Sequence, residues 1–151
     1  MIKITYGQIR NPNFAQALWK LNNFEGFEPK VAYNFARVFD KIQQFERKAN
    51  EVMTKKRDEL RDQYAKKNED GTVYEPQGPG SFEVAEEHRE VAETWFDDVD
   101  KIEEEIQRHK LSIDDAKAVK LAPKDLIALE PILDGLDDFD KPANTPDLKS
   151  V

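Results

Sequence analysis

Cysteine is absent from the 151 residues of this chain, which excludes a disulfide framework and thiol chemistry. Long hydrophobic runs are absent as well, because no apolar stretch approaches the roughly 20 residues that a helix needs to cross a bilayer. The opening stretch MIKITYGQIR lacks the apolar core of a secretory signal peptide. We therefore expect one soluble domain over residues 1–151 that is not exported through a signal peptide and has no membrane partner.

Histidine is scarce, and the common catalytic and metal-binding patterns are missing with it. His88 and His109 are the only two histidines, whereas zinc sites use more histidines or cysteines. There is no Gly-rich phosphate loop and no G-x-S-x-G motif, and the acidic run LDGLDDFD does not have the spacing of an EF-hand loop. We expect no catalytic residue, no cofactor and no metal site, and therefore no enzymatic activity.

The second half of the chain has few basic residues and is strongly acidic. Residues 1–80 hold 14 Lys/Arg and 11 Asp/Glu, a net charge of +3, and residues 81–151 hold 9 and 20, a net charge of −11, which together give the total of −8. Direct binding of nucleic acid is not expected, because it requires Lys and Arg to neutralise phosphates. A basic protein surface suits the acidic half better, and a merely solvated surface is the simpler alternative.

Helical periodicity is the main pattern that the sequence does contain. Residues 29–67 predict one long helix that begins at Pro29, and residues 82–109 predict a second. Their apolar residues recur mostly at alternating gaps of 3 and 4, the seam spacing of a coiled coil. The helix-pairing core predicted from these seams comprises Val31, Phe35, Val38, Ile42, Phe45, Val52, Val91, Trp95, Val99, Ile102 and Ile106.

Turn signals between the two helices predict that the chain reverses direction there. Residues 68–81 contain Asp70-Gly71 and Gly78-Pro79-Gly80, so this tip is either a loop or a small β-hairpin built from TVYE and SFEV. The two helices would then pack antiparallel, with the phenylalanines of the first near Ile102 and Ile106 of the second. The expected fold class is mainly α, a long coiled-coil-like antiparallel hairpin with a short helix and a small β element near its base.

Shorter elements flank the predicted hairpin. Residues 1–28 predict a strand over 2–6, from its alternating apolar residues, and then a short helix capped by Asn11 or Asn13. Residues 110–140 form a closing segment in which Lys110–Ile113 could be a strand and Pro123 opens a short helix. Ser112 could instead cap a helical turn. We expect strand 2–6 to pair with the 110–121 segment, and residues 141–151 to be an extended tail.

The closing segment also carries a resemblance. The stretch KLAPKDLIALEPIL, placed after a charged helical hairpin, resembles the closing element of small helical-hairpin proteins of uncharacterised function from tailed bacteriophages and prophages. Those proteins begin with a short strand, continue as a long helical hairpin and end on an L-x-P-x-D-L-x-x-L-E-P pattern. The resemblance implies the same organisation for this chain and transfers no catalytic residue. The residues that match the pattern are Leu121, Pro123, Asp125, Leu126, Leu129, Glu130 and Pro131.

These features favour a non-enzymatic bacteriophage-type structural or assembly protein, a minor virion component that acts by protein–protein interaction. Its partners would be copies of itself or virion proteins, and its location the host cytoplasm during assembly and then the virion. The alternative is an acidic inhibitor of one host protein, a counter-defence factor or nucleic-acid mimic. The candidate partner-binding residues are Phe39, Tyr64, Asp97, Asp100 and Glu104.

Overall fold

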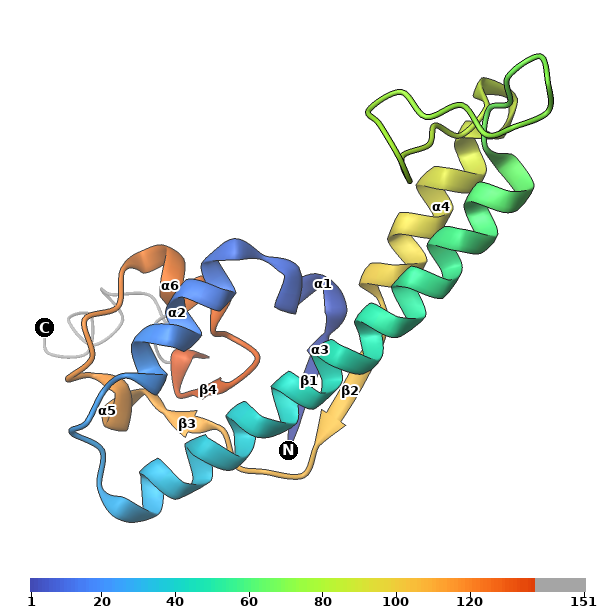
Figure 1. Ribbon diagram of the computed structural model, residues 1–151. Helices are drawn as coiled ribbons and strands as arrows, with labels where there is room; N and C mark the ends of the chain where they lie inside the picture. The colour runs from blue at the N-terminus through green and yellow to red at the C-terminus, as the bar shows by residue number, and fades with distance from the viewer. Residues whose placement is uncertain (138–151) are drawn as a thin grey trace, which may run out of the picture.

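The computed structural model describes residues 1–137 of the chain, so the predicted tail over 141–151 lies outside the described residues. The fold is mainly helical, with 58% helix and 12% strand, and it contains one long helix and small sheets. Figure 1 shows a compact base, to which both ends of the described chain contribute, and an arm that projects away from it. The predicted mainly α class is therefore confirmed. No helix within residues 1–137 is long and apolar enough to cross a membrane.

The first elements of the base are placed by local capping signals. Strand β1 (Ile2–Thr5) leads directly into α1 (Tyr6–Arg10) and α2 (Pro12–Asn22). Asn11 is the N-cap of α2, and its side-chain oxygen accepts a hydrogen bond from the Asn13 backbone N–H at 3.0 Å. The predicted strand ends one residue early, at Thr5, and the short helix α1 was not predicted, whereas the capped helix α2 is present with Asn11 rather than Asn13 as its cap.

Helix α3 (Pro29–Tyr64) spans 36 residues, about 54 Å at 1.5 Å per residue. The predicted helix 29–67 is thus confirmed to within three residues at its end. In its first half Phe35, Val38, Ile42 and Phe45 are buried in one cluster with residues of β1, α1 and α2. The prediction that this stretch packs against a second long helix is wrong. The apolar seam in the first half of α3 packs on the base instead. Val31, at the start of the seam, is only half-buried.

The second long helix, predicted over residues 82–109, is helical only in its central part. A 3₁₀ turn η1 (Glu86–His88) precedes α4 (Arg89–Asp100), and the chain then becomes strand β2 (Glu103–Ile106). Strand β2 pairs antiparallel with β1, with Ile2 opposite Ile106 and Thr5 opposite Glu103. Pairing with β1 satisfies backbone groups that the helix would have satisfied internally, and it turns Ile106 into the core.

Two further predictions that depend on that helix are also corrected. Strand β1 pairs with residues 103–106 and not with the 110–121 segment. Ile102 and Ile106 do contribute to the core, but from a turn and a strand rather than from a helical seam. The Tyr6 backbone N–H donates to the Ile102 carbonyl at 2.7 Å, which extends the pairing by one bond.

The arm consists of the distal half of α3 and of α4, which runs back along it (Figure 1). At the outer end the Ala85 N–H donates to the Tyr64 carbonyl at 2.9 Å, and the Tyr64 ring lies 4.9 Å from the His88 ring. Little is buried between these ends: beyond Ala49, α3 buries only Leu60, and α4 buries only Val99. The seam positions Val52 and Val91 are exposed, which corrects their prediction as core, and Trp95 is half-buried.

The tip is a loop and not the small β-hairpin that was the other possibility. Single bridges join Lys67 to Val73 and Ala65 to Val84, so TVYE and SFEV each meet the residues that follow α3 rather than each other. Gly71 and Gly78 have positive φ angles of 87° and 102°, which turn the chain in a conformation that other residues rarely adopt.

The closing segment completes the base. Strand β3 (Leu111–Ser112) leads into α5 (Ile113–Ala116), and α6 (Pro123–Ala128) is followed by β4 (Leu133–Asp134), which pairs parallel with β3. Both readings of this segment hold together, because Ser112 ends β3 and also caps α5 through the Asp114 N–H at 3.2 Å. Gly135 has a φ of 95°, and a Cβ there would lie 2.8 Å from Ile113 Cγ2, so this turn requires glycine.

Candidate partner-binding surfaces

The five predicted partner-binding residues are spread over the molecule and do not form one site. Phe39 is half-buried on the base, with its ring 6.3 Å from that of Phe35. The Tyr64 ring lies at a tilt beside the His88 ring at the outer end of the arm. Glu104 lies in β2, opposite Ile4, and not on the helix that carries Asp97 and Asp100. Only Asp97 and Asp100 remain together, one turn apart on α4.

One flank of α4 combines carboxylates with an exposed aromatic ring. Residues 86–100 hold seven Asp/Glu and a single Arg. On this helix Glu93, Asp97 and Asp100 follow each other at steps of four and three, and Phe96 lies between Glu93 and Asp100. The Phe96 side chain is 52% exposed, and its ring meets the edge of Trp95 with centroids 4.6 Å apart. We call Glu93, Phe96, Asp97 and Asp100 the acidic face.

The other flank of the arm, on α3, has the opposite charge. Residues 47–57 hold five Lys/Arg and one Glu. Val52, 41% exposed, has Lys48 one turn before it and Lys55 and Lys56 one turn after it. None of these three lysines makes an ion pair within residues 1–137. We call Lys48, Val52, Lys55 and Lys56 the basic face.

The two faces look away from each other. Helix α1 contacts both arm helices at their root: the Tyr6 hydroxyl hydrogen-bonds to the Asn50 side chain, and Arg10 pairs with Asp100 at 2.7 Å. Asn50 and Asp100 therefore mark one flank of the arm, and Asp100 belongs to the acidic face. Val52 is two residues, about 200° of helical rotation, from Asn50, so the basic face lies on the opposite flank.

A separate hollow of about 200 Å³ opens on the base between α2 and α3. Its apolar walls include Phe14, Leu18, Phe39 and Ile42, and Trp19 stands at its rim with 66% of its surface exposed. Phe39 was the only one of these residues predicted to face a partner. The position of Trp19 in the sequence could have indicated its exposure, because it lies beside the buried Phe14, Leu18 and Leu21 stripe of α2 rather than on it.

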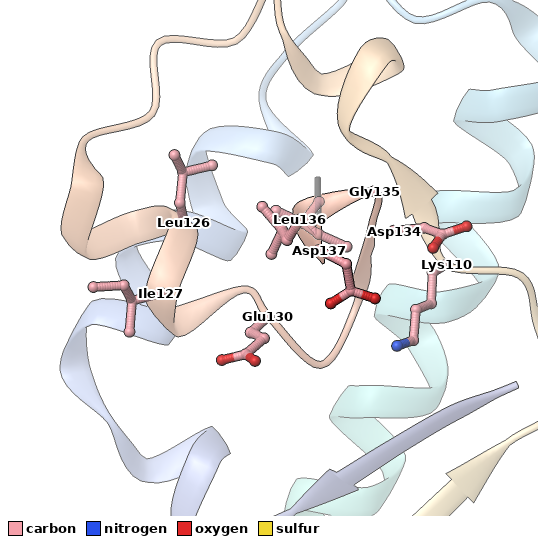
Figure 2. A pocket seen from close by; sticks show the side chains of 9 residues that line it. Lys110, Leu126, Ile127, Glu130, Asp134, Gly135, Leu136 and Asp137 are labelled. Carbon is pink, nitrogen blue, oxygen red and sulfur yellow. The ribbon is translucent and has the colours of Figure 1, made fainter. Parts of the chain in front are cut away.

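A more open hollow of about 310 Å³ lies against α6 and β4. Figure 2 shows its mixed lining, with Leu126 and Ile127 on one side and Lys110 and Asp134 on the other. Asp137, where the described chain ends, is itself part of this lining. The charged part of the lining consists of Lys110 and the carboxylates of Glu130, Asp134 and Asp137.

A buried ion pair joins α2 to α6. The Lys20 ammonium donates to Asp125 Oδ2 at 2.6 Å, and the Ala122 backbone N–H donates to the same oxygen at 2.8 Å. The Asp125 carboxylate is 0% exposed, and its Oδ1 has no hydrogen-bond partner within the described residues. Burial acts to raise the pKa of Asp125, but the bonds from Lys20 and Ala122 outweigh it, so the pKa lies below the usual 3.8. Asp125 thus links α6 to α2 inside the base.

This lowered pKa predicts a loss of stability in acid. A carboxylate with a depressed pKa in the folded state stabilises fully above its unfolded pKa, and the contribution disappears as pH falls through the folded value. We expect the free energy of unfolding to decrease below about pH 4, and to decrease less in the Lys20→Met/Asp125→Leu double variant. Urea unfolding from pH 7 to pH 3 measures both. Identical pH profiles for the two proteins would contradict the assignment.

Within residues 1–137 no group of three or more His, Asp or Glu side chains is arranged to hold a metal ion. Comparison of the chain with protein-family models, curated proteins and solved structures finds no match.

Proposed function

We propose that this chain is a non-enzymatic protein that acts by binding other proteins, as a structural or assembly component of a tailed-bacteriophage particle. The observation that carries the proposal is the arm. Beyond Ala49 its two helices bury only Leu60 and Val99 while they expose Val52, Val91 and Phe96. Most helices in proteins are held by packing of an apolar face, so an arm with so little internal packing is suited to packing against a partner.

The narrower part of the proposal comes from the sequence. The resemblance to small phage and prophage proteins rests on residues 121–131 and suggests a minor virion component, present in the host cytoplasm during assembly and then in the particle. In structural terms, we propose that the two arm helices form a coiled-coil-like hairpin, and that other copies or virion proteins cover its apolar seam.

A second candidate function is supported by charge alone. With seven carboxylates in residues 86–100, the arm could occupy a basic cleft of one host protein, as a counter-defence inhibitor or nucleic-acid mimic does. Such a complex would form quickly and weaken with salt, because long-range attraction between unlike charges is screened by ions.

The mass of the purified protein in solution separates these functions. We expect light scattering to give a defined oligomer, and an affinity-tagged form to recover virion proteins from infected cells. A monomer or dimer that recovers one host protein, released by salt, would support the inhibitor instead. A monomer that recovers neither virion proteins nor a host protein would refute both candidate functions.

A further inference from the structure

We propose that the acidic face of one copy docks on the basic face of a second copy, so that arms assemble face to back. This inference rests on the proposed function and names its partner, another molecule of this chain. Each arm carries one exposed apolar side chain within carboxylates, Phe96, and one within ammonium groups, Val52. The two faces are therefore complementary in charge and both apolar at the centre.

The charges on both faces are available for such a contact. Within residues 1–137, Glu93 and Asp97 make no ion pair, and neither do Lys48, Lys55 and Lys56. Asp100 alone is engaged, by Arg10, and that bond fixes the root of the acidic face. A central apolar contact surrounded by unlike charges is the usual anatomy of a protein–protein interface, with the charges setting orientation and partner choice.

The placement of the faces determines the kind of assembly. Because the acidic and basic faces lie on opposite flanks of the arm, two copies cannot satisfy both faces in a two-fold dimer. A contact between two different surfaces is heterologous, and each added copy leaves one face of each kind open. Such contacts propagate until they close into a ring, or continue as a filament when the rotation does not close.

Paired charge reversals test this inference. In the first variant Glu93→Lys and Asp97→Lys make both faces basic, and in the second Lys55→Glu and Lys56→Glu make both acidic. We expect each variant alone to self-associate about tenfold or more weakly than the parent, because like charges then meet. An equimolar mixture should regain assembly, because the two reversed faces are complementary to each other and so are the two unchanged faces.

Matched controls separate the faces from net charge. Two control variants change the net charge by the same amounts at exposed positions of the base: Asp114→Lys/Asp115→Lys and Lys117→Glu/Lys120→Glu. Both should assemble to the same mass as the parent protein. Circular dichroism verifies that every variant is folded, and sedimentation over a concentration series at about 50 and 500 mM NaCl measures association, which salt should weaken.

The outcomes distinguish this inference from the proposed function. Loss of assembly in each variant and recovery in the mixture support the face-to-back contact. An oligomer that neither reversal weakens, or a mixture that does not regain assembly, overturns the contact but leaves a protein-binding function in place. A parent protein that stays monomeric at both salt concentrations yet recovers virion proteins overturns the contact in the same way.

Discussion

Replacing Phe45 by alanine is expected to lower the free energy of unfolding by about 3–5 kcal/mol. Phe45 is buried at the middle of α3, in the cluster that joins this helix to the base. Truncation removes most of the ring's apolar burial and leaves a cavity that the surrounding strands and helices can fill only in part. Urea unfolding followed by circular dichroism measures the loss.

A matched pair of valines on the same helix provides the control. Val38 and Val52 occupy equivalent positions of the predicted seam, but Val38 is buried in the base whereas Val52 is exposed on the arm. We expect Val38→Ala to cost about 2 kcal/mol and Val52→Ala less than about 0.5 kcal/mol. Equal losses at the two positions would mean that the seam is buried along its whole length, as the sequence pattern predicts and the structure does not.

Replacing Lys20 by methionine is expected to cost about 2–3 kcal/mol, because it leaves the buried Asp125 carboxylate without its cation. The Lys20 side chain is itself 36% exposed, so water can replace part of what the ammonium supplied, and the loss stays at the lower end for a buried pair. Thermal or urea unfolding at pH 7 measures the change.

The double variant Lys20→Met/Asp125→Leu should be more stable than Lys20→Met alone, because it removes the uncompensated charge together with its partner. Lys117→Met, at an exposed lysine of the base, should change stability by less than about 0.5 kcal/mol. If Lys20→Met is as mild as Lys117→Met, the ion pair does not hold α2 to α6.

The sequence predicts those elements whose signals are local. Asn11 and Pro12 define the start of α2 within a few residues, and the regular seam from Val31 to Val52 predicts the part of α3 that it covers. The missed strand β2 lacks any such local signal. Its sequence EEEI consists of good helix formers, and it becomes a strand because β1, about 100 residues earlier, supplies the partner. Tertiary pairing here overrides propensity.

The candidate surfaces were predictable only in part, for a related reason. Spacing shows which residues share a face but not what that face meets, so Phe35 and Val52 look alike in the sequence although the base buries one and not the other. The carboxylates Asp97 and Asp100 were predicted. Their neighbour Phe96 and the rim residue Trp19 were not, because each lies beside an apolar stripe rather than on it.

The pairing of β1 with β2 also imposes an order on synthesis. Ile2 meets Ile106 across the sheet, so the first strand emerges from the ribosome long before its partner is made. At about 5–20 residues per second, the roughly 100 intervening residues take on the order of 5–20 s. Through that interval β1 lacks its partner strand, whereas the proximal face of α3 can already pack on α1 and α2. The sheet of the base forms only late, and until then the unpaired edge of β1 is open to chaperones and to other nascent chains.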